Sequence, residues 1–155
     1  MSKCKLVDKV KYKRKLSIAP LDLCLKKELI LEEHYKAAIF FVFLYKVRYG
    51  TQVKLHNSYS VFLKIMGISP SPNIYNEDCL VKYSITYHQM ALLLKKIKAF
   101  DLVCDICVFD ITPKFLRTVP KNMNYNYQIF SEYKLFRSAL SELTKYLNNK
   151  RFFSR

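Results

Sequence analysis

The sequence predicts a single all-α domain of about five helices. Its 155 residues are enough for one domain with a hydrophobic core. Hydrophobic residues make up 51% of the chain and aromatic residues 15%, which is too much apolar content for a disordered chain. Only two glycines occur, whereas a turn-rich β-sandwich or barrel normally needs more of them, so the low glycine count favours helices.

Positive charge is concentrated at both ends of the chain. Residues 1–15 carry a net charge of +6 and residues 111–155 carry +7, whereas residues 16–110 carry only +2 of the total of +15. We divide the chain accordingly into a basic arm (1–15), a helical domain (16–149) and a basic tail (150–155). A balanced body with basic ends suits contact with a polyanion, which nucleic acid, an anionic membrane surface or an acidic protein would each provide. Enrichment in lysine codons with solvated ends would explain the same pattern without a partner.

A short first helix is expected over residues 17–27. Pro20 suits the first turn of a helix, and Leu21, Cys24 and Leu25 recur at helical spacing. Because only a short connection separates this segment from the next predicted helix, the two are expected to pack as a hairpin.

The second helix, over residues 32–48, is the element around which the fold is expected to form. It opens with two acids and closes with Lys46 and Arg48, as the helix dipole favours, and Gly50 just beyond its end is a usual stop. Its run Ala37–Tyr45 is wholly apolar or aromatic but falls far short of the roughly 20 residues that span a membrane. We therefore expect a helix that is buried on most sides, and no transmembrane segment.

Residues 51–76 are expected to form an irregular surface excursion. Thr51–Leu55 fits a short extended piece and Ser60–Met66 fits a helical turn, but Pro70 and Pro72 break regular structure. Such excursions are more often variable than functional.

Two further helices are expected between residues 77 and 109. Apolar residues with a period near 3.6 predict the first over 77–100, and three lysines gather at its C-terminal end, where the dipole favours cations. Asp101 is expected to cap the second helix, over 102–109. The apolar residues are Leu80, Tyr83, Ile85, Tyr87, Met90, Leu93, Leu94 and Ile97, and the lysines are Lys95, Lys96 and Lys98.

The last helix is expected over residues 131–148, after a loop (111–126) with a helical turn around Phe115. This segment is the clearest amphipathic pattern in the chain, because its apolar and polar residues separate onto two faces. The apolar face holds Leu135, Phe136, Ala139, Leu140, Leu143, Tyr146 and Leu147, and the polar face holds Lys134, Arg137, Ser138, Ser141 and Lys145.

The five cysteines indicate reduced thiols. Their number is odd, their spacing is irregular and no secretory signal precedes them, which favours a cytoplasmic protein without disulfides. Cys104 and Cys107 form a CxxC, which a zinc site or a redox pair would use. A second cysteine pair or a histidine pair at suitable spacing is missing, so we expect no metal and interpret both as buried structural side chains. Zinc or redox chemistry is the alternative.

The residue types that enzymes need do not converge in the sequence. The acid pairs Glu32 with Glu33 and Glu77 with Asp78 most simply serve helix starts and solvated faces. No Walker motif, GxSxG or HExxH occurs, and two glycines are too few for a loop that cradles a nucleotide. We therefore expect no enzyme, no cofactor and no small-molecule substrate.

Two stretches of the chain carry a recognisable pattern. Residues 20–43 read PLDLCLKKELILEEHYKAAIFFVF and residues 127–147 read YQIFSEYKLFRSALSELTKYL. They resemble the opening and the closing helix of a family of domains of unknown function found in alphaproteobacteria and their phages. The family's glycine after the alanine is Ala38 here, and its Gly-Trp-Pro segment has no counterpart in a chain without Trp. The resemblance implies a bacterial protein in a nucleic-acid context, because some members are fused to helix-turn-helix segments. The matching positions are Pro20, Leu21, Glu33, Tyr35, Ala37, Lys134, Arg137, Ala139, Leu140 and Leu143.

The first functional hypothesis is a non-enzymatic nucleic-acid-binding accessory or regulatory protein, with DNA favoured over RNA. Its basic side chains would neutralise phosphates, and interleaved Tyr and Phe would stack on bases. The candidate residues are Lys11, Lys13, Arg14 and Lys15 in the arm, and Lys134, Arg137, Lys145, Lys150 and Arg151 near the end of the chain.

Two alternatives stay open. A protein-interaction module or homodimer would use apolar surface from Phe40–Tyr45 or Phe152–Phe153. A membrane-surface protein would bind anionic lipid through the two basic ends.

Overall fold

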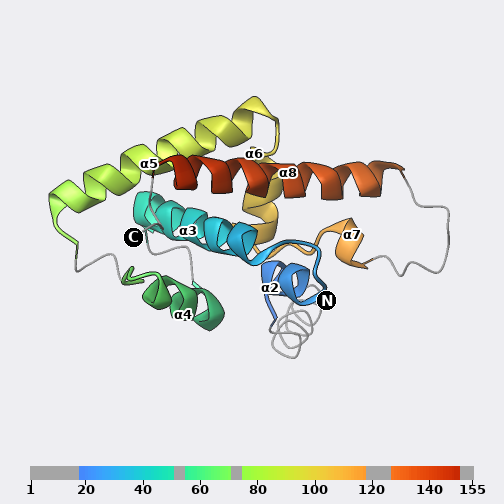
Figure 1. The fold of residues 1–155 in the computed structure, drawn as a ribbon, viewed down its shortest axis with the longest axis horizontal. Helices are drawn as coiled ribbons and strands as arrows, with labels where there is room; N and C mark the ends of the chain where they lie inside the picture. The colour runs from blue at the N-terminus through green and yellow to red at the C-terminus, as the bar shows by residue number, and fades with distance from the viewer. Residues whose placement is uncertain (1–17, 51–54, 71–74, 118–126, 151–155) are drawn as a thin grey trace, which may run out of the picture.

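The computed structural model describes residues 18–50, 55–70, 75–117 and 127–150. Within these ranges the chain forms one all-α domain with no strand, which confirms the predicted fold class (Figure 1). Seven α-helices and one π-helical turn occur there, against about five helices expected. They are α2 (Pro20–Lys26), α3 (Glu32–Tyr49), α4 (Asn57–Ile65), α5 (Glu77–Lys96), α6 (Phe100–Val103), the π-helical η3 (Cys104–Val108), α7 (Lys114–Arg117) and α8 (Tyr127–Asn149).

Helix α3 lies at the centre of the domain. Helices α5 and α8 lie on one side of it and α2 and α4 on the other (Figure 1). Every residue from Ala37 to Leu44 is buried, so the helix has no solvent-facing side over two turns. It ends at Tyr49, and its C-cap is Gly50, whose positive φ of 83° is one that glycine adopts without strain. The predictions of a buried central helix and of its glycine stop are both confirmed.

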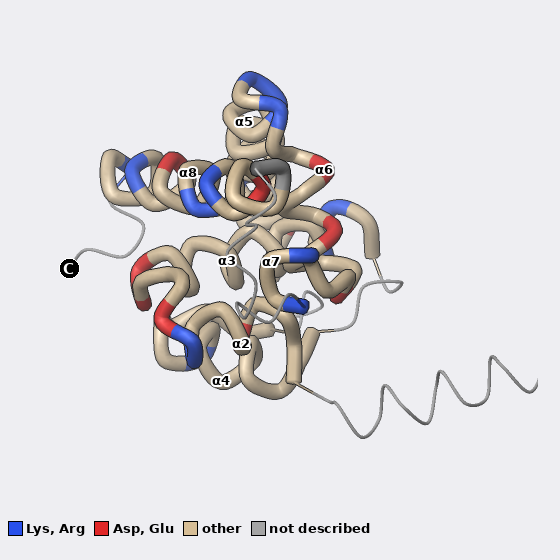
Figure 2. The backbone as a smooth tube through the Cα atoms, turned by 90° about the vertical axis from the view of Figure 1, so that its right-hand side faces the viewer, with Lys and Arg blue, Asp and Glu red and all other residues tan. Residues whose placement is uncertain are grey.

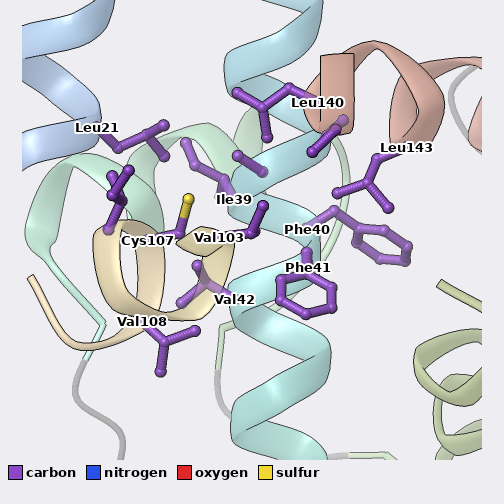
Figure 3. Packing of buried hydrophobic residues seen from close by; sticks show 14 of the residues in the cluster. Leu21, Ile39, Phe40, Phe41, Val42, Val103, Cys107, Val108, Leu140 and Leu143 are labelled. Atoms are coloured by element: carbon purple, nitrogen blue, oxygen red, sulfur yellow. The ribbon is translucent and has the colours of Figure 1, made fainter. Parts of the chain in front are cut away.

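The core consists of side chains that reach α3 from several helices (Figure 3). Phe41 stacks on Tyr87 of α5 with ring centroids 5.7 Å apart, and it meets the edge of Phe100 of α6 at 6.5 Å. Leu140 and Leu143 of α8 are fully buried in the same cluster. Burial of an aromatic or leucine side chain contributes about 1.5–3 kcal/mol, so this all-round packing is the main stabilising term for α3.

Helix α4 lies in the segment for which the sequence predicted an irregular excursion. It overlaps the helical turn expected over Ser60–Met66 but begins three residues earlier, so the segment is more regular than predicted. Tyr59 and Leu63, four residues apart, are both fully buried and anchor one face of the helix. A helical signal was present, because Tyr59, Phe62, Leu63 and Met66 recur at helical spacing and all four pack in or against the core. The nearby Pro70 and Pro72 led to the prediction of an irregular segment instead. Residues 51–54 and 71–74 lie outside the described ranges.

Three details between residues 77 and 109 differ from the predictions. Ile85 belongs to the predicted apolar stripe of α5 but is 54% exposed. Asp101 lies inside the first turn of α6 instead of capping it, since the N-cap is Ala99. The predicted helix over 102–109 is the second part of α6 followed by the π-helical turn η3, after which Asp110 adopts a left-handed φ of 57°.

The C-terminal helices match the expectations closely. The helical turn around Phe115 is α7, and α8 begins four residues before the predicted start. The predicted apolar face of α8 is confirmed, because its central residues Phe136, Ala139, Leu140 and Leu143 are fully buried. None of the helices in the described part of the chain is both long and apolar enough to span a bilayer.

Candidate nucleic-acid interface

Four of the nine predicted phosphate-binding residues lie in the described part of the chain. They are Lys134, Arg137, Lys145 and Lys150, and all four are exposed. The other five, Lys11, Lys13, Arg14, Lys15 and Arg151, lie outside the described residues.

Three of these four cations share one face of α8. At about 100° per residue, Lys134, Arg137 and Lys145 fall within an arc of about 80°, and at 1.5 Å per residue they cover about 17 Å of the helix. We call these three residues the α8 basic stripe. Lys150 lies apart from it, because its Nζ sits over the ring of Tyr146, 5.9 Å from the centroid, on another side of the helix. The structure thus brings together three of the four described candidates.

An open groove of about 790 Å³ lies between α8 and the N-terminal end of α3. Lys134 and Arg137 stand on its α8 wall, with two serines beside them. Its lining residues are Leu31, Glu33 and His34 from the start of α3, and Phe130, Tyr133, Lys134, Arg137, Ser138 and Ser141 from α8.

Aromatic side chains hold the two cations of the groove. Lys134 Nζ lies 4.8 Å from the centroid of the Phe130 ring, a cation–π contact. Arg137 Nη1 donates a hydrogen bond of 3.2 Å to the hydroxyl of Tyr133, which itself donates to the carbonyl of Leu29 at 2.7 Å. One of the five N–H groups of the Arg137 guanidinium is therefore used to fix its position within the domain.

Sequence reasoning named neither Phe130 nor Tyr133, although a signal for both was present. Each aromatic residue precedes its cation by four positions, which places the pair on the same face of a helix. The opposite wall of the groove had no such signal, because Leu31 and His34 are about a hundred residues away in the chain.

His34 contributes no positive charge to the groove at neutral pH. Burial is the main cause that lowers its pKa; the carboxylate of Glu33 opposes this effect and Arg137 adds to it. Its Nδ1 accepts a hydrogen bond of 3.4 Å from the backbone N–H of Leu31, which requires an unprotonated Nδ1. The positive charge of the groove therefore comes from Lys134 and Arg137, and Glu33 offsets part of it.

The described surface as a whole is only weakly basic. It carries 16 Lys and Arg against 11 Asp and Glu, a net charge of +5, while the total is +15. Figure 2 shows these cations on several elements, including α8 and the end of α5, with acids between them. The α8 basic stripe is therefore a local feature. The basic arm and residues 151–155 of the tail lie outside the described residues.

A second polar cluster, which the sequence did not reveal, joins α2, α3, α4 and the end of η3. Asp22 accepts hydrogen bonds from the hydroxyls of Tyr35 (2.5 Å) and Ser58 (2.6 Å). His56 Nε2 lies 2.7 Å from Asp110 Oδ2, and this hydrogen bond raises the pKa of His56. Ser58 donates to Asp22 and not to His56, so the hydroxyl, imidazole and carboxylate do not form a catalytic triad. The cluster fastens four elements together.

The cysteines of the CxxC are buried side chains, as predicted. Cys104 and Cys107 face the core, where Cys24 of α2 is also buried. Burial raises the pKa of Cys24 and of Cys104 to about 12, so both are protonated thiols at neutral pH. Among the described residues no group of three or more His, Cys, Asp and Glu could hold a metal ion.

The apolar run Phe40–Tyr45 cannot serve as the interaction surface proposed from the sequence. Phe40 to Leu44 are buried in the core of their own domain, because helices cover α3 on all sides. Phe152–Phe153, the other candidate surface, lies outside the described residues.

Comparison of the chain with models of known protein families, with curated proteins and with solved structures finds no match. The resemblance of residues 20–43 and 127–147 to phage-associated domains stays a prediction.

Proposed function

We propose that this protein is a non-enzymatic, cytoplasmic nucleic-acid-binding protein with an accessory or regulatory role, and that the α8 basic stripe contacts phosphates. One observation carries the proposal: Lys134, Arg137 and Lys145 share an exposed face of α8 that covers about 17 Å. Phosphates along one strand of a duplex recur about every 3.4 Å along the axis, so three cations spread over this length can each reach a different phosphate. The resemblance to phage-associated domains favours DNA over RNA.

The groove beside the stripe supports the same proposal. Arg137 keeps N–H donors beyond the one it gives to Tyr133, and paired N–H groups of a guanidinium fit the oxygens of a phosphate. The hydroxyls of Ser138 and Ser141 line the same wall and are further donors for phosphate oxygens. Because the described surface carries only +5, the arm and tail, which hold most of the remaining charge, would strengthen binding without specifying the position.

A salt series separates a defined interface from attraction to net charge. Binding of labelled single-stranded DNA, duplex DNA and RNA is measured by fluorescence anisotropy for the wild type and for the triple variant Lys134→Gln, Arg137→Gln, Lys145→Gln. The expected result is weaker binding. For duplex DNA the slope of log affinity against log salt is expected to be smaller by about 2.7, or 0.9 for each phosphate that the variant no longer neutralises.

The matched control has the same change in charge at other exposed positions. Lys26→Gln, Lys64→Gln and Lys82→Gln lie on α2, α4 and α5, away from the stripe. We expect this control to keep the wild-type slope. Equal weakening in both triple variants would mean that net charge alone attracts the ligand. Wild-type protein that binds anionic lipid vesicles but no nucleic acid at low salt would refute the proposal.

A further inference from the structure

The outer face of α5 carries a narrow apolar stripe that no other described element covers. Val81, Ile85 and Leu92 are 57%, 54% and 52% exposed, and His88 is exposed between them. At about 100° per residue these four residues fall within an arc of about 60°. We call them the α5 seam. The inner face of the helix packs on α3 and α8, and α5 stands at the edge of the molecule in both views (Figures 1 and 2).

The charges at the two ends of α5 flank this seam in a regular way. Glu77 and Asp78 lie in its first turn, Lys95 and Lys96 lie in its last turn, and all four are exposed. On the helical projection Glu77 and Lys95 lie on one flank of the seam, at the same angle. Asp78 and Lys96 lie on the other flank, also at the same angle.

The whole pattern is symmetric about the middle of the helix. Val81 and Leu92 are equally far from a midpoint between residues 86 and 87, and so are Ile85 and His88. The pair Glu77 and Lys95 and the pair Asp78 and Lys96 each have a midpoint within half a residue of the same point. A face of this kind is complementary to a copy of itself turned by 180°.

We propose that the α5 seam binds a second copy of this chain, with the two α5 helices antiparallel about a twofold axis. A twofold axis perpendicular to the helices brings equal flanks together. Val81 then faces the partner's Leu92, and Ile85 faces the partner's His88. On the flanks Glu77 meets the partner's Lys95, and Asp78 meets the partner's Lys96, so each interface has four opposite-charge pairs.

Charge selects this arrangement over the others. A parallel pair would place acid beside acid at one end and lysine beside lysine at the other, which is unfavourable. A groove of about 390 Å³ borders the seam, and Arg48 lines it together with Lys95. The partner's Glu77 would therefore meet two cations at this end.

The oligomeric state without nucleic acid tests the proposal independently of the function proposed for α8. In sedimentation equilibrium the wild type is expected to dimerise reversibly as its concentration rises. Ile85→Glu places a carboxylate in the seam and is expected to weaken the dimer by roughly tenfold or more. Val61→Glu is the matched control, because Val61 of α4 is also 54% exposed and lies on another surface. A monomeric wild type, or equal dimerisation of the Ile85→Glu variant, overturns the proposal.

A charge exchange tests the register. The variant Lys95→Glu, Lys96→Glu has acids at both ends of α5, and the variant Glu77→Lys, Asp78→Lys has lysines at both ends. Each alone is expected to remain monomeric because like charges meet. An equimolar mixture is expected to restore the dimer as a heterodimer, with circular dichroism confirming that both variants are folded. A mixture that stays monomeric while the wild type dimerises overturns the antiparallel register.

Discussion

At the scale of single residues, two buried tyrosines differ in a way that sequence cannot show. Tyr35 and Tyr59 pack edge to face with ring centroids 6.4 Å apart. The hydroxyl of Tyr35 donates to the carboxylate of Asp22, whereas the buried hydroxyl of Tyr59 has no hydrogen-bond partner among the described residues. Burial raises the pKa of both phenols, so both are protonated at neutral pH.

This difference predicts opposite responses to the same substitution. Tyr35→Phe removes a hydrogen bond to a charged acceptor and is expected to lower the free energy of unfolding by about 1.5–3 kcal/mol. Tyr59→Phe removes an unsatisfied buried hydroxyl, so its stability is expected to be equal to or higher than that of the wild type. Urea denaturation followed by circular dichroism measures both. A destabilisation by Tyr59→Phe as large as that by Tyr35→Phe would contradict this account of the cluster.

At the scale of elements, one ion pair joins the start of α4 to Asp110, two residues after the end of η3. His56 is the N-cap of α4, and Asp110 follows the π-helical turn in a left-handed conformation. Their hydrogen bond of 2.7 Å is the main cause that raises the pKa of His56 above its ordinary value of 6.5. Two short elements, each with few buried residues of its own, are thereby held to each other.

The pair predicts how stability depends on pH. Because the folded protein binds the His56 proton more tightly than the unfolded chain does, the pair stabilises fully below pH 6.5 and loses this effect as pH rises through the raised pKa. His56→Gln is therefore expected to cost most at acidic pH and progressively less above it, measured by urea denaturation across that range. Both groups are partly exposed, so solvent screening keeps the effect modest.

Asp110→Asn is the matched variant for this test. Asparagine keeps the shape of the side chain and tolerates the left-handed φ, but it removes the charge that holds the proton on His56. In the Asp110→Asn background, His56→Gln should lower the free energy of unfolding by about the same amount at all these pH values. A difference that still declines with rising pH would assign the effect to another partner of His56. The contribution of His34 to the pH dependence of stability has the opposite sign. Because the pKa of His34 is lowered in the folded protein, the fold loses stability as pH falls below 6.5.

At the scale of the whole molecule, stability is concentrated on α3. All the larger helices of the described part pack against it, and its central two turns contribute only buried side chains. Phe41 lies between α5 and α6, where it contacts Tyr87 and Phe100. A substitution of Phe41 therefore alters the packing of α5 and α6 as well as that of α3.

Phe41→Ala is expected to lower the free energy of unfolding by about 3–5 kcal/mol, because it removes a buried ring and leaves a cavity. That decrease is a large part of the roughly 5–15 kcal/mol by which domains are stable. Phe109→Ala is the control: its ring is 51% exposed, and it is expected to cost well under half as much. Thermal and urea unfolding measure both, and equal destabilisation would show that α3 is not the main source of stability.

Local patterns in the sequence were sufficient for much of the fold. The apolar run Ala37–Leu44 already required a helix surrounded by others, and Gly50 marked its end. The two faces of α8 were readable because polar and apolar residues separate cleanly there, and the same separation placed Lys134, Arg137 and Lys145 on one exposed side. Each of these features depends on residues within a few turns of one another.

Other features depended on contacts between distant segments. Ile85 has the spacing of a core residue, but α5 has apolar residues over more of its circumference than α3 and α8 can cover, so packing decided which of them remain exposed. The groove beside the basic stripe joins segments that are roughly a hundred positions apart in the chain. The two residues of the His56–Asp110 pair are 54 positions apart. The sequence alone determined the helices, the buried centre and the charged face of α8, because these follow from side-chain periodicity within one element. The tertiary structure decided which faces meet and which remain open, because that choice is made only when several elements compete to cover the same core.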